Sequence, residues 1–265
     1  MSEFVGRGRP LGAGAFGDAL RRLGIGAPEL WAVIRVETSG AGFLADRRPV
    51  ILFERHWFSR LTDRRFDEVA PEISDRRPGG YGARGAHQYE RLQRALALDR
   101  GAALESTSWG LGQVMGFNAV PAGFADVERM VAAMVEGEDA HLEGMAGFIA
   151  GQGLASFLAR RDWAGFARRY NGPGFLHNRY DEKLRAAFAR YAEGPLPSLE
   201  VRAAQLRLFY LDHDPRGIDG FLGPRTAAAL RAFQERWGLP VTGALDAATG
   251  DALEEAVERA AAALA

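Results

Sequence analysis

The chain has 265 residues, of which 33 are Lys or Arg and 34 are Asp or Glu, so its formal net charge is −1. This length suggests one or two domains, and an apolar content of 47% allows a packed core. Because there is no cysteine, disulfides, thiolate metal sites and cysteine nucleophiles are excluded. A net charge near zero gives no indication of a nucleic acid or an anionic membrane as partner.

The sequence contains no apolar run of the roughly 18 residues that a membrane-spanning helix needs. Glycines and Asp18 interrupt the N-terminal stretch, which makes it a poor signal peptide. We therefore expect neither a signal peptide nor a transmembrane segment.

The first 195 residues are predicted to be mostly helical. The segment Pro28–Thr38 begins with a proline in its first turn and places Leu30 and Ile34 on one face, as an amphipathic helix does. Residues 50–58 form an apolar run of ambiguous type, and residues 74–85, rich in Arg, Gly and Pro, indicate a loop. Further helices are expected over Phe16–Leu23, Gln88–Asp99, Asp126–Ile149, Leu154–Arg161, Trp163–Tyr170 and His177–Ala192.

A domain boundary is expected where Gly194, Pro195 and Pro197 end the preceding helix and Ser198 can cap a new one. We place a first domain at residues 1–195 and a second at residues 196–265. The second is predicted to hold three helices: Val201–Tyr210, Arg225–Trp237 and one from Leu245 onward. Since alternating strand patterns are scarce, the predicted fold class is mainly α.

Glu37 ends an otherwise apolar helix that includes Trp31, Val33 and Ile34. A carboxylate beside apolar neighbours is poorly solvated, so its pKa rises and it stays protonated near neutral pH. That is the state a general acid for glycosidic cleavage requires. The alternative is an ordinary solvated glutamate at a helix end.

Glycines 110, 112 and 116 in the segment 106–118 allow close approach of the backbone. Trp109 offers a face for a sugar ring, and Gln113 and Asn118 offer amides for hydroxyl or acetamido groups, as in a carbohydrate cleft. A glycine-rich helix junction is the alternative.

Tyr170 and Asn171 stand at the end of another predicted helix, where Gly172, Pro173 and Gly174 force a turn. Both side chains therefore project from a fixed position, although Asn near a helix C-cap is also common without any function.

In this order, the three segments resemble the lysozyme-like superfamily of soluble lytic transglycosylases and goose-type lysozymes. That family has Glu-Ser at a helix end, then Gly-x-x-Gln, then Ala-Tyr-Asn-x-Gly-Pro. The matching residues are Glu37-Thr38, Gly110–Gln113 and Arg169–Pro173, the last with one residue fewer between Asn and Pro. Residues 36–58 and 108–118 resemble more closely the N-acetylmuramidase domain of phage and prophage endolysins, within a similarity that covers roughly residues 12–192.

The resemblance implies that Glu37 is the acid that protonates the glycosidic oxygen, and that residues of the cleft hold the sugar and this glutamate. Thr38 replaces the usual Ser of transglycosylases and Gly112 their frequent Met, which favours a muramidase. The predicted substrate-binding residues are Gln113, Tyr170, Asn171, Trp109, Asn118 and Ser108.

A hydrolase that inverts needs a second carboxyl group to activate water, about 6.5–9.5 Å from the first. Glu54 is the first candidate because it lies in an apolar run, where a charge needs a reason. It can instead pair with a neighbouring arginine. Asp46 is the reserve, and His56 can hydrogen-bond Glu54.

The remaining histidines show no metal-ligand spacing such as HExxH, so we expect no metal and no cofactor. They are His87, His141, His177 and His213.

The C-terminal part resembles the peptidoglycan-binding domain, a three-helix module with a D-G-x-x-G-x-x-T turn. The resemblance is carried by Leu206–Leu211, Ile218–Thr226, Ala229–Gln234 and Gly238–Asp246. Most of these residues form turns and caps. The candidates for wall binding are Asp219, Gly220, Phe221 and Gln234.

We therefore expect an endolysin: a monomeric cell-wall hydrolase that cuts the β-1,4 bond between N-acetylmuramic acid and N-acetylglucosamine in peptidoglycan. The expected partner is peptidoglycan alone, without nucleic acid or membrane. The family implies accumulation in the host bacterial cytoplasm and release through a pore, and the lack of cysteine fits a reducing compartment. The alternatives are a lytic transglycosylase, which leaves a 1,6-anhydro end, and a non-catalytic peptidoglycan-binding protein.

Overall fold

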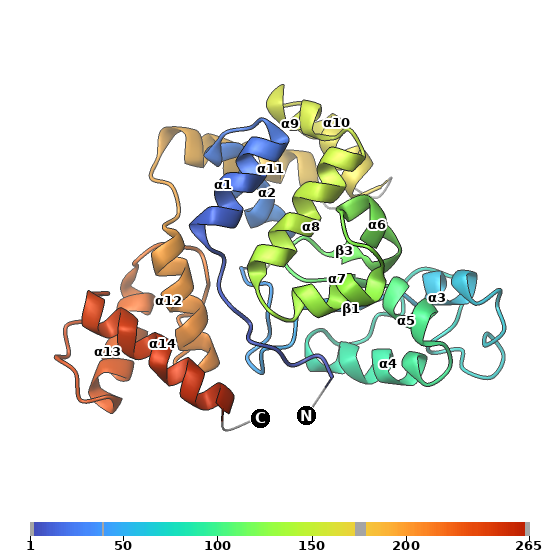
Figure 1. The fold of residues 1–265 in the computed structure, drawn as a ribbon. Coiled ribbons are helices and arrows are strands. Elements are labelled where there is room, and N and C mark those ends of the chain that lie inside the picture. The colour runs from blue at the N-terminus through green and yellow to red at the C-terminus, as the bar shows by residue number, and fades with distance from the viewer. Residues whose placement is uncertain (1–2, 39, 173–178, 263–265) are drawn as a thin grey trace.

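The computed structural model describes residues 3–38, 40–172 and 179–262, and within them the fold is mainly α, which confirms the predicted class. An N-terminal body, up to Glu193, packs around α8, and a C-terminal body, from Ser198, lies beside it (Figure 1). The elements are α1 (Ala13–Leu23), α2 (Ala27–Glu37), β1 (Ile51–Phe53), α3 (Arg55–Leu61), α4 (Ala86–Leu96), α5 (Arg100–Glu105), β2 (Thr107–Trp109), β3 (Val114–Met115), the 3₁₀ turn η1 (Gly116–Asn118), α6 (Ala119–Ala122), α7 (Val127–Met134), α8 (Glu138–Gly151), α9 (Ala155–Ala159), α10 (Trp163–Tyr170), α11 (Tyr180–Glu193), α12 (Leu199–Tyr210), α13 (Pro224–Arg236) and α14 (Ala247–Ala262).

The single helix predicted over residues 126–149 is wrong, because α7 ends at Met134 and α8 begins at Glu138. The N-terminal segment pairs with the residues between the two helices. The N–H of Arg9 donates to the carbonyl of Glu136 at 3.0 Å, and the N–H of Glu138 donates to the carbonyl of Arg9 at 2.9 Å. These bonds satisfy backbone groups that a continuous helix would have used internally.

A three-stranded antiparallel sheet interrupts the helices. None of its strands was predicted, since β1 lies in the run 50–58, whose type was left ambiguous, and no strand was expected at β2 or β3. β1 pairs with β2 so that Ile51 lies opposite Trp109, and β2 pairs with β3 so that Trp109 lies opposite Val114. The strands have three, three and two residues, which is too short for an alternating pattern to be seen in the sequence.

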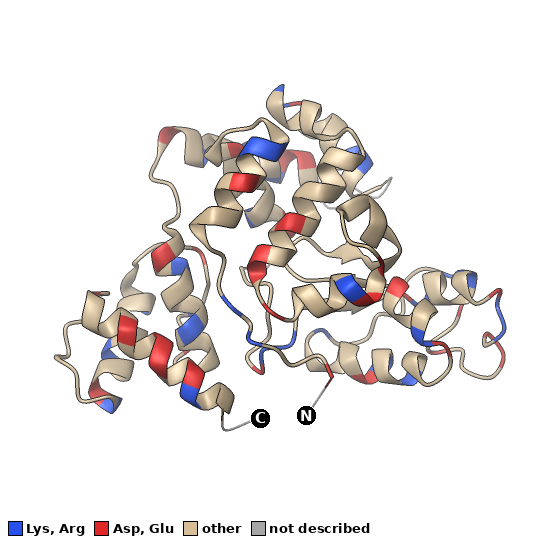
Figure 2. Ribbon diagram, viewed as in Figure 1, with Lys and Arg blue, Asp and Glu red and all other residues tan. Residues whose placement is uncertain are grey.

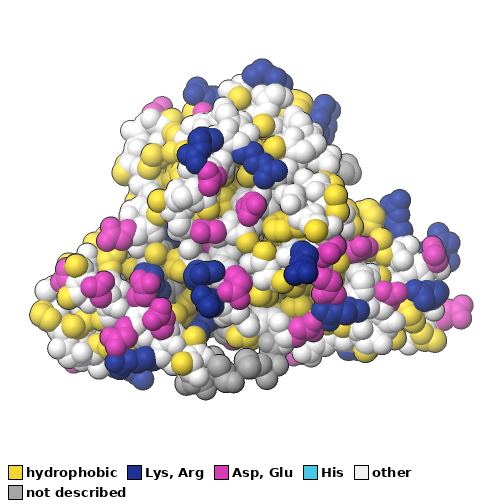
Figure 3. Space-filling view, viewed as in Figure 1, with side chains coloured by type: hydrophobic (Ala, Val, Ile, Leu, Met, Phe, Trp, Pro, Cys, Tyr) yellow, Lys and Arg dark blue, Asp and Glu magenta, His cyan; other side chains and the backbone are white. Residues whose placement is uncertain are grey.

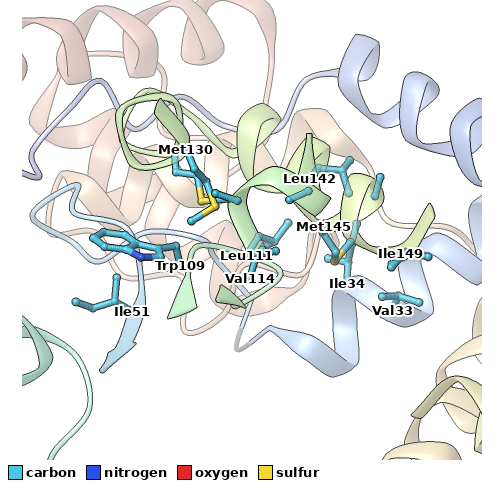
Figure 4. Close-up of a cluster of buried hydrophobic side chains, with 14 of the residues drawn as sticks. Val33, Ile34, Ile51, Trp109, Leu111, Val114, Met130, Leu142, Met145 and Ile149 are labelled. Atoms are coloured by element: carbon cyan, nitrogen blue, oxygen red, sulfur yellow. The ribbon is translucent and has the colours of Figure 1, made fainter. Parts of the chain in front are cut away.

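Each body has a hydrophobic core of its own. The larger core joins α2, α8 and the sheet, and Figure 4 shows Ile34, Trp109 and Met145 among its side chains. The smaller core includes Leu230 and Phe233 of α13. Separate cores are what two domains have.

A buried ion pair joins the two bodies. Arg202 of α12 and Glu138 of α8 are 1% and 0% exposed, and two nitrogens of Arg202 contact the carboxylate, one at 2.9 Å. Although burial alone would raise the pKa of Glu138, the charge and hydrogen bonds of Arg202 lower it below its ordinary value. The same carboxylate accepts the N–H of Leu11 at 3.1 Å and of Gly42 at 2.8 Å.

The surface carries both signs of charge. Acidic and basic residues occur on the helices of both bodies (Figure 2), and they are interspersed on the face that Figure 3 shows. Within the described part of the chain, no helix is both long and apolar enough to cross a membrane.

Candidate active site

Glu37 is the last residue of α2, and residues 29–34 of this helix are buried. The Glu37 side chain is itself half-buried. Burial raises the pKa of Glu37 from 4.5 to about 7, against the opposing effects of a hydrogen bond from Asn171 and the charge of Lys183. With this pKa, about half of the molecules carry a protonated Glu37 at neutral pH, which suits a general acid.

Asn171 holds the Glu37 carboxyl group. Its Nδ2 donates to both carboxylate oxygens, at 3.3 and 3.1 Å, and its backbone N–H, at the end of α10, donates to the carbonyl of Ala167 at 2.9 Å. The Oδ1 atom of Asn171 is buried and accepts no hydrogen bond from the described residues. The asparagine therefore stabilises the ionised form of Glu37 and keeps one acceptor for another donor.

Tyr170 connects α10 to the turn between β2 and β3. Its hydroxyl donates to the carbonyl of Gly112 at 2.9 Å, and its ring stacks on Phe166 at 5.1 Å between centroids. Burial and the charge of Glu37 raise its pKa well above 10. Tyr170 is therefore a neutral donor that positions the turn beside Glu37.

Gln113 uses both of its N–H donors inside the protein. Nε2 donates to the carbonyl of Val50 at 3.1 Å and to that of Gly110 at 2.8 Å, and Oε1 accepts the Ser108 hydroxyl at 2.9 Å. Gln113 therefore fixes the β2–β3 turn against β1, and a contact with sugar through its remaining acceptor capacity stays a prediction.

Two of the predicted substrate contacts are wrong. Trp109 is 0% exposed and its Nε1 donates to the carbonyl of Leu104 at 3.1 Å, so no sugar can stack on it. It lies in the core because β2 is the central strand (Figure 4). Ser108 is also buried and donates its hydroxyl to Gln113. Asn118, half-buried at the end of η1, stays a predicted contact.

Glu54 follows β1 and precedes α3, with its backbone N–H bound to the carbonyl of Ser106 at 3.0 Å. Burial raises the pKa of its carboxyl group, while His56 and the Tyr81 hydroxyl lower it. The Nδ1 atom of His56 lies 3.1 Å from Glu54 Oε2. Glu54 is thus a half-buried carboxyl with polar neighbours. Asp46, by contrast, is exposed and pairs with Arg48 at 2.6 Å.

The loop 74–85 lies close to Glu54 and to Tyr180, a neighbour of Glu37. Tyr81 faces Glu54, and the negative charge of Glu54 contributes to the raised pKa of the Tyr81 hydroxyl. Burial and the charge of Glu37 raise the pKa of Tyr180, which the charge of Arg84 lowers. Since Tyr81 and Arg84 are three residues apart, at most about 10 Å of chain separates them. The loop therefore links the surroundings of Glu54 to those of Glu37.

A comparison with models of protein families matches residues 26–192 to the N-acetylmuramidase family. The chain belongs to this family. It is therefore a glycoside hydrolase of the N-acetylmuramidase type.

The second domain is also matched. Residues 197–253 match the putative peptidoglycan binding domain, so the chain is a muramidase with a C-terminal peptidoglycan-binding domain and peptidoglycan as its substrate and partner. The exact boundary between residues 195 and 196 stays a prediction. No curated protein matches the chain.

Among solved structures, the muramidase is similar to one described as a Burkholderia AP3 phage endolysin. The two share 40% sequence identity with a TM-score of 0.65, over 69% of this chain and 71% of the other. The chain is thus a cell-wall lytic enzyme.

The residues proposed for wall binding mostly form hydrogen bonds within the peptidoglycan-binding domain itself. Gln234 is 0% exposed, and its amide binds Thr242, Gly243 and Thr249. The prediction that Gln234 binds the cell wall is therefore wrong. The Oδ1 atom of Asp219 accepts the N–H of Phe221 at 3.0 Å and so stabilises the turn that also contains Gly220.

Three residues near Glu37 and Glu54 were missed: Tyr81, Tyr180 and Lys183. Their sequence neighbourhoods carry no motif, because Tyr81 lies in a glycine-rich loop and the others in an amphipathic helix. Only the packing of α11 against α2 brings Tyr180 and Lys183 to Glu37.

Proposed function

We propose that this muramidase is a phage or prophage endolysin that hydrolyses the β-1,4 bond between N-acetylmuramic acid and N-acetylglucosamine, with Glu37 as the general acid. The observation that carries the proposal is the half-buried Glu37. Its pKa is raised to about 7, and its two carboxylate oxygens accept hydrogen bonds from the Asn171 amide. As an endolysin it accumulates as a monomer in the host cytoplasm and acts on the cell wall after release through a pore.

In the proposed reaction, protonated Glu37 gives its proton to the glycosidic oxygen as the bond to C1 of N-acetylmuramic acid breaks. Water attacks C1 and loses a proton to a second carboxylate, so that one water is consumed for each bond cut. The Asn171 amide and the Lys183 charge stabilise the Glu37 carboxylate that remains.

Glu54 is the proposed acceptor of the proton from water. Its carboxyl group is partly buried and lies beside the polar side chains of His56 and Tyr81. Asp46 has no comparable surroundings, since it is exposed and neutralised by Arg48. A lytic transglycosylase needs no second carboxylate, so the polar setting of Glu54 favours hydrolysis.

The assignment is tested with Glu37→Gln and Glu54→Gln, measured as release of reducing ends from purified peptidoglycan. We expect Glu37→Gln to lower the rate roughly 1,000-fold or more, and Glu54→Gln roughly 100-fold or more. Both variants should still sediment with intact walls. Glu143→Gln, an exposed glutamate on α8, is the matched control and should keep wild-type activity. Lytic activity in Glu37→Gln above a tenth of wild type would refute the role of Glu37.

A further inference from the structure

A cavity of about 660 Å³ lies between the two domains. Its walls come from α2 and α11 of the muramidase domain and from residues 217–219 of the peptidoglycan-binding domain. Val36 and Thr38, the two neighbours of Glu37 in the chain, both line it. Glu37 itself does not line the cavity, but the charge of Lys183, which does, acts on the Glu37 carboxyl group. The cavity therefore extends from a charged neighbour of Glu37 to the second domain.

Positive charge dominates the lining. Arg35, Lys183 and Arg190 line the cavity, and none of the three forms an ion pair with a carboxylate among the described residues. Lys183 lies over the ring of Tyr180 at 5.5 Å and Arg190 over that of Phe221 at 5.3 Å. All three side chains are exposed to solvent. Arg35 and Arg190 are free to meet an anion, while the charge of Lys183 also acts on Glu37.

The other two charged residues of the lining, Arg202 and Asp219, already have hydrogen-bond partners within the protein. Arg202 binds Glu138 and the carbonyl of Gly40, and Asp219 accepts hydrogen bonds from Gln205 and Phe221 within its turn. The described lining therefore offers no counter-charge to Arg35, Lys183 or Arg190.

The cations are spaced along one helix face. Lys183 and Arg190 are seven residues apart on α11, which places them on the same side and about 10 Å apart along the axis. Ala186 and Ala187 lie between them in the lining, so only small side chains separate the two charges. Arg35 comes from the neighbouring helix α2. This arrangement suits an extended ligand that carries more than one carboxylate.

The substrate supplies such a ligand. In peptidoglycan, the lactyl group of N-acetylmuramic acid carries a short stem peptide with free carboxylates. An extended peptide of four residues spans up to about 14 Å, which exceeds the roughly 10 Å between Lys183 and Arg190 along α11, so the carboxylates of one stem can meet both cations.

We propose that this interdomain cavity binds the carboxylates of a stem peptide, with Arg35, Lys183 and Arg190 as the recognition residues. The inference rests on the proposed function, because it requires the glycan to lie at Glu37. The turn 217–219 of the peptidoglycan-binding domain then forms part of the wall of this recognition cavity.

The test compares soluble glycan strands that carry stem peptides with the same strands after removal of the stems by an N-acetylmuramoyl-L-alanine amidase. The wild type should cut the stem-bearing strands with a higher kcat/KM. In the double variant Arg35→Gln/Arg190→Gln, the ratio of kcat/KM between the two strands should fall roughly fivefold or more, because two charge pairs are lost. Raising the salt concentration should lower the wild-type ratio as well.

Arg185→Gln is the matched control, because Arg185 is an exposed arginine of α11 that does not line the cavity. This variant should keep the wild-type ratio. An equal rate on both strands for the wild type, or an unchanged ratio in the double variant, would overturn the proposal.

Binding separates the proposal from the proposed catalytic function. Fluorescence anisotropy of labelled strands with the Glu37→Gln variant measures stem recognition without cleavage, and the stem-bearing strands should bind more tightly. If the wild type cuts neither strand, the glycosidase assignment fails, while this binding difference still supports the cavity, and equal binding of both strands refutes it.

Discussion

The pKa of Glu37 is set by burial and by two polar neighbours, Asn171 and Lys183. The apolar residues of α2 around it raise its pKa, while the Asn171 amide and the Lys183 charge hold the pKa at about 7. Without these polar neighbours the acid would stay protonated to higher pH, and its conjugate base would be poorly stabilised after proton transfer.

Asn171→Ala tests this balance. The hydrogen bond from Asn171 lowers the pKa of Glu37, so its loss raises that pKa, and the basic limb of the kcat/KM profile, near pH 7 in the wild type, should move to higher pH. The maximum rate should fall roughly 10- to 100-fold because the carboxylate loses its donor. A pH–rate profile measures both effects. A basic limb that stays in place or moves to lower pH would contradict the assigned role.

At the residue scale, the order of short motifs predicted Glu37, Tyr170 and Asn171 as neighbours, because each stands at a helix end whose position the sequence defines. The prediction for Trp109 was wrong since its burial depends on pairing between distant segments, with Ile51 and Val114 as its partners in the sheet. Tyr81 could not be predicted for the same reason.

The helix α8 is the element that holds the site together. Burial lowers the pKa of His141 on this helix to about 4, so the ring is neutral. Its Nδ1 accepts the N–H of Leu111 at 3.2 Å, and its Nε2 lies 2.7 Å from the carbonyl of Met134. The turn that Tyr170 and Gln113 bind is thereby fixed to α8.

Gly110→Ala tests how tightly the turn is fixed. Gly110 has φ +68, and an added Cβ would lie 2.6 Å from the buried His141 ring. We expect a loss of about 2 to 4 kcal/mol in the free energy of unfolding. Gly14→Ala on the exposed face of α1, where a Cβ meets nothing within 4 Å, is the control and should gain about 0.5 to 1 kcal/mol. Urea denaturation measures both, and equal stabilities of the two variants would show that the turn can move away from α8.

At the element scale, the sequence predicted the three helices of the peptidoglycan-binding domain within a few residues, since prolines and glycines mark their ends. The break between α7 and α8 could not be predicted, because it depends on backbone bonds to Arg9, which is more than a hundred residues away.

The two domains are joined as one unit by the buried pair of Arg202 and Glu138. Arg202 also donates to the carbonyl of Gly40 at 2.9 Å, and Glu138 accepts the N–H of Gly42. The peptidoglycan-binding domain is therefore attached to the segment that follows Glu37. The sequence offered no signal for this contact, because Arg202 lies in a helix with no distinctive pattern around it.

Arg202→Met tests the junction. The substitution leaves the Glu138 carboxylate buried without its partner, which should cost about 3 to 5 kcal/mol. We expect the wild type to unfold in one calorimetric transition and Arg202→Met in two. Arg207→Met removes an exposed pair with Glu254 and should cost less than about 1 kcal/mol. The pair would not be what joins the domains if Arg202→Met unfolded in a single transition at the wild-type temperature.

Hydrolysis at N-acetylmuramic acid is tested by digesting purified peptidoglycan and determining the masses of the soluble fragments. We expect fragments with reducing N-acetylmuramic acid ends, each heavier by one water than a 1,6-anhydro product. Anhydro ends would contradict this expectation, because the enzyme would then be a transglycosylase and Glu54 would have no water to activate.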